Sequence, residues 1–392
     1  MREQIPPHDR RTAWTRRNVL AAVGAGMSTT LAGCTSTGPA PDPGPALISS
    51  WPPETDAEAV VTRSVYHGWL SQVEPSFRER TGAKIRNLGD PIQWDVHRDT
   101  DPLSGSVIAP VIDRVPDLRN KEGPTEAIDV VDVRPGWLEM GIENDLVASL
   151  PTEQMPAWEN LPDELQDGPH RQDGRTCGIP TVKILSALVY NTDVFQSAPD
   201  SWEVLWNKAH RGNVVLGGGY WDMPLIAALY TGQDPRDPTD FEAVGEALKT
   251  LREQAGSLST PLEAFEAVTT GDAEVGLMRQ STVFQARFKR GAAVDYTVPS
   301  EGAVYKCFYH LIPKTAPNPM AALSLVNWLA RPEASDPLFR REGVVPAVDA
   351  SSHLPEDIRS YLRWDNEWTL HNIFPLSEEL SVAYGEQLRN VF

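Results

Sequence analysis

Short apolar segments that fit β-strands alternate with longer segments of helical periodicity along most of this chain. A strand is expected over residues 59–65 and a helix over 71–80, which Gly82 ends because glycine adopts a left-handed cap at little cost. The helical pattern is clearest over residues 239–254, where a capping box precedes an apolar face. This alternation predicts an α/β fold in which helices cover a sheet.

The first 34 residues have the parts of an export signal in the expected order. Arg16 and Arg17 precede an apolar run over residues 19–32, which at about 14 residues is too short to span a bilayer, since a spanning helix needs ~20. Paired arginines in this position are typical of a twin-arginine (Tat) signal. The run closes on Leu31-Ala32-Gly33-Cys34, which is similar to a lipobox, in which the leader is cut before the cysteine and the thiol is lipidated.

A tether is expected after the leader. Residues 35–56 are rich in Thr, Ser, Gly and Pro, a composition typical of flexible linkers. A lipid on Cys34 followed by such a tether predicts a protein held at the outer face of the cytoplasmic membrane by its anchor alone. The alternative is a cysteine that lies in an apolar stretch by chance.

The charge of the chain disfavours nucleic acid as a partner. Acidic residues outnumber basic ones 54 to 35, and a net charge of −19 repels phosphate backbones. Eight of the basic residues are lysines, and an acid-rich, lysine-poor composition indicates adaptation to high salt. An ordinary acidic soluble protein is the alternative.

No motif indicates an enzyme or a metal centre. The chain contains no GxSxG elbow, CxxC or HExxH, and the glycines at 217–219 are not followed by the Lys-Ser/Thr of a phosphate loop. We therefore predict no catalytic residue, no metal and no cofactor. Cys177 and Cys307 either pair or remain buried free thiols; nothing in their spacing indicates a pair, so we expect the free thiols.

Three groups of motifs occur in an order typical of one protein family. They are Gly178-Ile179-Pro180 with residues 185–191, then Ser201-Trp202 to residue 214, and then short motifs at 271–276, 299–302, 311–314 and 327–333. From about residue 60 to its end, the chain therefore resembles periplasmic solute-binding proteins of the spermidine/putrescine-binding type, which serve ABC importers.

The resemblance implies a two-lobed periplasmic-binding-protein type II fold, with hinge strands and a ligand cleft between the lobes. Lobe I is expected to comprise residues 57–180 and 308–350, with an insertion at 89–126, and lobe II residues 181–307. Residues 351–392 are expected to form helices that pack on the lobes. The implied partners are a small-molecule solute and ABC permease subunits, and we expect a monomer that closes over its solute by hinge motion.

The resemblance also indicates which residues bind the ligand. Family acids align with Gly219, Asp222 and Phe308, and family aromatic residues align with Lys183, Arg279 and Lys306, so that Asp222 alone keeps a carboxylate. Because the family uses acids and aromatic walls to hold ammonium groups, this exchange favours an anionic or zwitterionic ligand. Four further residues lie at strand ends or loop starts that line the family's pocket, namely Tyr66, His67, Trp137 and Tyr220.

Other interpretations stay open at this point. Each basic residue can instead pair with one of the many carboxylates of the chain. The ligand can be a polyamine, as in the family, or a ferric ion held by tyrosines and His67. The same scaffold can also carry a surface-anchored enzyme or adhesin, because a fold does not dictate function.

Overall fold

The computed structural model describes residues 51–89, 128–217, 219, 221–255, 259, 261–373 and 376–392. All of them belong to one of the two compact units of the chain, Pro39–Phe392. The predicted leader (1–34), residues 35–50 of the predicted tether, residues 90–126 of the predicted insertion and Tyr220 lie outside the described residues.

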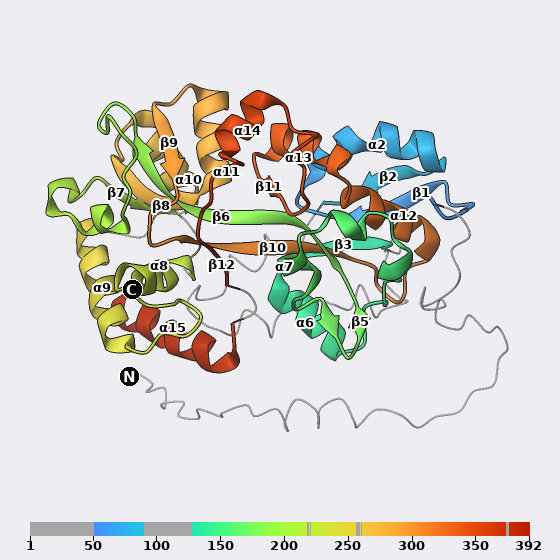
Figure 1. Ribbon diagram of the computed structural model, residues 1–392, viewed down its shortest axis with the longest axis horizontal. Coiled ribbons are helices and arrows are strands. Elements are labelled where there is room, and N and C mark those ends of the chain that lie inside the picture. Colours follow the sequence, from blue (N-terminus) through green and yellow to red (C-terminus); the bar gives the residue numbers. More distant parts are fainter. Residues whose placement is uncertain are drawn as a thin grey trace, which may run out of the picture. The chain divides into compact units, whose positions relative to one another are not determined.

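Two long antiparallel strands, β6 (Ile179–Asn191) and β10 (Ala303–Leu311), occupy the centre of a ten-stranded mixed sheet (Figure 1). The order along the sheet is β2-β1-β3-β10-β6-β8-β7, while β9 and β11 also pair with β6 and β12 pairs with β10. The other strands are β1 (Ala59–Arg63), β2 (Lys84–Asn87), β3 (Val130–Val133), β7 (Val214–Leu216), β8 (Val275–Arg279), β9 (Val294–Thr297), β11 (Val345–Pro346) and β12 (Leu370–Asn372). A separate hairpin consists of β4 (Arg171–Gln172) and β5 (Arg175–Thr176).

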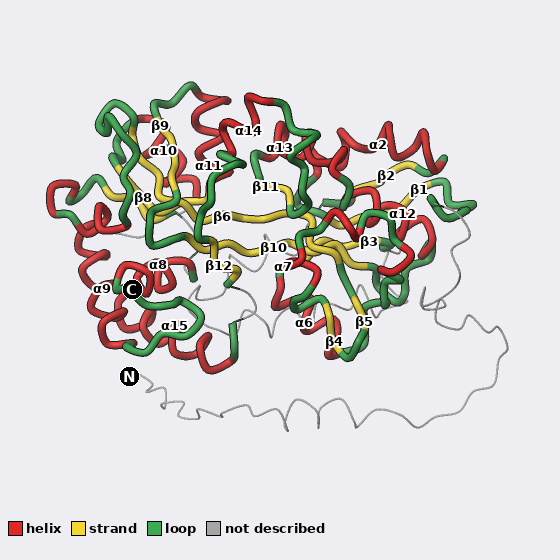
Figure 2. Tube along the Cα trace, viewed as in Figure 1, coloured by secondary structure: helices red, strands yellow, loops and turns green. Residues whose placement is uncertain are grey.

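The helices fall into two groups that follow the two ends of the sheet (Figure 2). With β1, β2 and β3 lie α2 (His67–Thr81), α6 (Pro135–Glu143), α7 (Asp163–Gln166), α12 (Pro319–Leu329) and α13 (Ser335–Glu342). With β7, β8 and β9 lie α8 (Asp222–Tyr230), α9 (Phe241–Ala255), α10 (Pro261–Thr270) and α11 (Gln280–Phe284), the last continued by a π-helical turn at Gln285–Lys289. The C-terminal segment adds α14 (Glu356–Leu362) and α15 (Glu378–Val391). This is the predicted α/β fold with two lobes joined by crossing strands.

Helix α2 illustrates how the local sequence specifies the buried face of a helix and the residue at which it ends. Trp69, Leu70, Val73 and Phe77 recur at helical spacing and are all buried. The helix ends where predicted, at Gly82, whose φ of 79° lies in the left-handed region and whose N–H donates to the Arg78 carbonyl.

One buried tryptophan anchors each lobe through its indole N–H. In the first lobe, Trp69 donates to the carbonyl of Ala334 at 2.8 Å. In the second, Trp202 donates to the carbonyl of Gly302 at 2.7 Å, and Ser201 beside it donates to Glu301 at 2.6 Å. The predicted Ser201-Trp202 motif therefore anchors the turn before β10 to the second lobe. The motif needs a hydroxyl and an indole because each of these groups donates a hydrogen bond to that turn.

The predicted lobe boundaries at 180/181 and 307/308 fall inside β6 and β10. Residues 177–190 contain two apolar runs around Lys183, yet β6 continues through this lysine without interruption. The lobes are therefore joined by continuous strands.

The C-terminal segment contains a strand that the sequence did not predict. Residues 370–372 of β12 pair in parallel with residues 303–305 of β10. Tyr384 of α15 donates its hydroxyl to the Pro235 carbonyl at 2.8 Å and packs edge-to-face on Phe241 of α9. Both the strand β12 and the helix α15 therefore attach the C-terminal segment to the second lobe.

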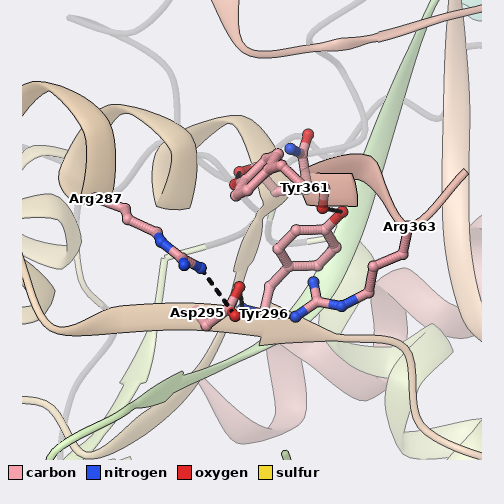
Figure 3. Close-up of polar contacts among 6 residues, drawn as sticks. Arg287, Asp295, Tyr296, Tyr361 and Arg363 are labelled. Atoms are coloured by element: carbon pink, nitrogen blue, oxygen red, sulfur yellow. Dashed lines mark hydrogen bonds and ion pairs between the residues drawn. The ribbon is translucent and has the colours of Figure 1, made fainter. Parts of the chain in front are cut away.

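A polar cluster fixes the first part of this segment (Figure 3). The hydroxyl of Tyr296 in β9 donates to the Tyr361 carbonyl at 3.0 Å. The carboxylate of Asp295 lies 2.9 Å from both Arg287 and Arg363. These contacts join α14 and the residue after it to β9 and to the π-helical turn.

Cys177 and Cys307 are both buried and are not joined by a disulfide, as the interpretation as two separate thiols predicts. Within the ranges described above, no helix has the length and apolar character needed to cross a membrane.

Candidate functional site

Three strands bring polar side chains to one face of the sheet, at the middle of the crossing strands. Ser186 of β6 lies opposite Arg279 of β8 and opposite Val304 of β10. Residues directly opposite in an antiparallel pair share a face, and Lys306 shares it as well because it lies two residues beyond Val304. The strand register therefore collects Ser186, Arg279 and Lys306.

Asp222, the first residue of α8, is a buried acid that contacts this group. Lys306 Nζ lies 3.2 Å from Asp222 Oδ1, while the Ser186 hydroxyl at 2.6 Å and the Gly219 N–H at 3.1 Å donate to Oδ2. Burial raises the pKa of Asp222, but Lys306, Ser186, Arg279 and Gly219 together outweigh it and lower the pKa below its ordinary value. Asp222 is thus a charged carboxylate whose two oxygens both accept hydrogen bonds from the chain itself.

Lys306 lies among other positive groups. Its side chain is only 13% exposed. Burial lowers the pKa of Lys306, Asp222 opposes this shift, and the nearby positive charges of Arg279 and Arg134 add to it, so that the pKa ends below its ordinary value. Lys306 and Arg279 therefore both stabilise the charge of Asp222, and Arg134 adds a further positive charge that acts on Lys306.

An aromatic pair borders the same cations. Tyr66, the residue before α2, and Phe308 of β10 pack edge-to-face with ring centroids 5.6 Å apart and planes at 79°. The guanidinium carbon of Arg134 lies 6.0 Å from the centroid of the Phe308 ring, at the limit of cation–π attraction. Burial and then Asp132 raise the pKa of Tyr66, whereas Arg279 and Arg134 lower it, so both arginines lie close to this tyrosine.

We call this group the central cluster. Its members are Tyr66, Asp132, Arg134, Ser186, Gly219, Asp222, Arg279, Lys306 and Phe308.

Gly219 is a close neighbour of the ion pair. A Cβ atom at this position would lie 3.3 Å from Asp222 Oδ2 and 3.4 Å from Lys306 Nζ, closer than most real Cβ contacts. The glycine therefore leaves room for the lysine ammonium beside the acid.

Three predicted ligand-binding residues lie away from the central cluster in the structure, and the structure does not describe a fourth. Lys183 pairs with Cys307, one residue away from Lys306, and so lies on the opposite face of the sheet, with its Nζ 5.5 Å from the centroid of the Tyr305 ring. His67 is exposed, Trp137 lies partly buried on α6, and Tyr220 is outside the described residues.

Sequence reasoning missed Ser186, Asp132 and Arg134. Ser186 is a single hydroxyl inside the apolar run of β6, and such a lone polar residue is a signal for an internal hydrogen bond. Asp132 and Arg134 lie at the end of β3, and ligand-binding residues of α/β folds gather at strand ends.

No group of three or more His, Cys, Asp or Glu side chains in the described part of the chain is placed to hold a metal ion. The ferric interpretation would depend on tyrosine ligands together with His67, which is exposed.

Comparison with known proteins decides the family. Residues 117–361 match the profile of the bacterial extracellular solute-binding proteins. The chain belongs to this family. The spermidine/putrescine-binding protein of Escherichia coli (strain K12) is 24% identical over 213 residues, which is 53% of this chain and 60% of that protein. The chain thus spans less than two thirds of that relative. The putrescine-binding protein PotF of the same organism is 23% identical over 333 residues, covering 76% of this chain and 84% of PotF.

Solved structures of solute-binding proteins share the fold. The spermidine/putrescine-binding protein PotD of Streptococcus pneumoniae, solved with calcium and HEPES, aligns with a TM-score of 0.70 at 17% identity, over 86% of this chain and 98% of PotD. AgtB of A. tumefaciens R10, solved with agropinic acid, aligns with a TM-score of 0.56 at 18% identity, over 86% of this chain and 97% of AgtB. These family members are transport proteins rather than enzymes, and the resemblance read from the motifs is confirmed.

Proposed function

We propose that this family member binds a small solute with an acidic group, either an anion or a zwitterion, and delivers it to the permease of an ABC importer. The observation that carries the proposal is the saturation of Asp222 by Lys306, Ser186 and Gly219. A solute amine would have to displace a lysine that is already paired. In contrast, among the described residues no hydrogen bond or ion pair engages the guanidinium of Arg279, which is therefore available to a ligand.

The chemistry of guanidinium groups supports the same choice. The positive charges of Arg279 and Arg134 both lower the pKa of Lys306 and of Tyr66, so the central cluster carries more positive charge than Asp222 alone neutralises. A guanidinium binds a carboxylate or phosphate through two parallel hydrogen bonds, and it repels an ammonium group. Agropinic acid in AgtB is an acidic ligand on the same fold.

Polyamine binding is the second candidate, because several relatives are named for spermidine or putrescine. Calorimetry separates the two candidates. We expect no tight binding of spermidine or putrescine, and tight binding of a carboxylate- or phosphate-bearing solute identified by mass spectrometry of natively purified protein. Tight polyamine binding without any acidic solute would establish the second candidate.

The sequence supports a place for this activity outside the cytoplasm. Arg16 and Arg17 are proposed to direct export through the Tat route. Cys34 is proposed to carry a lipid that holds the protein at the outer face of the cytoplasmic membrane. The high negative charge of the chain, −19 before the basic leader is removed, would keep the exported protein soluble in concentrated salt. Binding with domain closure and without turnover would separate this function from an enzyme on the same scaffold.

A further inference from the structure

We propose that Lys306 is a built-in occupant of an amine subsite. Its Nζ fills the place where the ammonium group of a solute would otherwise meet Asp222, and removing its side chain converts the central cluster into a site for small primary amines. The inference deepens the proposed function, since it names the residue that excludes cationic solutes, and it concerns the same cluster.

The hydrogen bonds of Asp222 define the subsite. Ser186 and the Gly219 N–H both donate to Oδ2, which leaves Oδ1 to Lys306 Nζ at 3.2 Å. Without the lysine, Oδ1 would be a buried and unpaired carboxylate oxygen, because the Asp222 side chain is only 1% exposed. Such an oxygen gains far more from an ammonium donor than an exposed carboxylate does, since water no longer competes for it.

The space left by the lysine sets the size of the amine. Truncation of Lys306 to alanine removes a chain of three methylene groups and the ammonium group. A free amine stays at van der Waals distance from the new methyl group, which is longer than the carbon–carbon bond of the lysine side chain. Ethylamine and propylamine therefore match the vacated volume better than longer amines. The second ammonium of a diamine would lie toward Arg279 and Arg134, whose charges repel it.

Lys306→Ala tests the proposal directly. We expect ethylamine and propylamine to raise the melting temperature of this variant in a saturable manner at constant ionic strength, with no such shift in the unmodified protein. The double variant Lys306→Ala/Asp222→Asn removes the acceptor charge, and it should bind the same amines roughly tenfold to 100-fold more weakly. Tetramethylammonium, which has no N–H to donate, should produce no shift in any variant.

Lys183→Ala is the matched control. It also removes a lysine from the crossing strands and leaves a similar space, but on the opposite face beside Tyr305 and away from Asp222. Amines should not stabilise it. If Lys306→Ala folds only when amine is present, that result supports the proposal as well.

Lys306→Met keeps the apolar part of the lysine side chain. It is the variant to test if Lys306→Ala does not fold. It leaves only the ammonium position vacant, so ammonium and methylamine are the probes. If the folded Lys306 variants respond to amines no more than Lys183→Ala does, the proposal is overturned. Acid binding by the unmodified protein is measured separately, so failure of the proposed function is distinguishable from failure of this inference.

Discussion

The guanidinium of Arg363 donates to the carboxylate of Asp295 at 2.9 Å, across 68 positions of sequence (Figure 3). The same guanidinium lies 4.7 Å from the centroid of the Tyr296 ring. Through this one side chain, the segment that follows α14 is held to β9 of the second lobe. The contact is partly buried, since 24% of the Arg363 side chain and 15% of the Asp295 side chain are exposed.

Arg363→Ala should lower the free energy of unfolding by about 1–2 kcal/mol, because a partly buried charged hydrogen bond and a cation–π contact are lost. Residue 363 has a φ of 50°, and arginine and alanine both carry a Cβ, so the backbone cost is unchanged and the difference reports the side chain. Urea unfolding measures it. Lys249→Ala, which removes an exposed pair with Glu246, is the control and should change stability by at most about 0.5 kcal/mol. Equal effects of the two variants would contradict the prediction.

Arg279→Ala should weaken binding of the acidic solute by about 2–5 kcal/mol, or 30- to several-thousand-fold, because a charged hydrogen bond inside a partly dry site is lost. Calorimetry on the folded variant checks this expectation. Arg290→Ala, which removes an exposed arginine eleven positions along the chain, should leave the affinity unchanged. An unaltered dissociation constant for Arg279→Ala would exclude this residue from the ligand site.

His310 should make the protein less stable as the pH falls below neutrality. Burial lowers its pKa to about 3, and its ring nitrogen lies 2.7 Å from the Thr181 hydroxyl. Since the unfolded chain binds a proton near pH 6.5 and the folded one does not, stability is present above pH 6.5 and is lost as the pH falls from there toward 3, by up to about 1.4 kcal/mol per pH unit. Urea unfolding at pH 7 and pH 5 measures the slope.

His310→Gln should reduce that slope but not abolish it, because burial also lowers the pKa of His170 to about 4. Substitution of the exposed His353 by glutamine should leave the slope as it is. A slope that is the same in all three proteins would show that His310 does not carry the effect.

Cys34→Ala should move the exported protein from the membrane fraction to the soluble fraction, because acyl chains on this thiol are the proposed attachment. Fractionation in high salt removes electrostatic attachment and isolates the lipid contribution. Ser36→Ala, a change of similar size in the tether, should leave the protein at the membrane. Membrane retention of the Cys34 variant in high salt would rule out this cysteine as the anchor.

The double variant Arg16→Lys/Arg17→Lys should cause precursor to accumulate inside the cell. It preserves charge but removes the guanidinium pair that the Tat pathway recognises. The ratio of precursor to mature protein, read by immunoblotting, checks the outcome. Unchanged export would mean that the chain uses another route.

The fold class, the family and six of the nine positions of the central cluster could be predicted from sequence patterns and motifs. Helical and strand periods are local properties, so the apolar face of α2 and its end at Gly82 are readable without the tertiary structure. The motif at Ser201-Trp202 is likewise readable, although only the structure showed that the indole of Trp202 bonds to Gly302.

Which side chains meet depends on how distant segments pack, and this could not be predicted from the sequence. Lys183 and Lys306 are both lysines of the crossing strands, yet the pairing of Lys183 with Cys307 puts them on opposite faces of one sheet. A shift of one residue in register exchanges the two faces, and the packing of distant segments sets that register. For the same reason the hydrogen bond of Ser186 to Asp222, the approach of Arg134 to Phe308 and the pairing of β12 with β10 follow from contacts between remote parts of the chain, which no local pattern encodes.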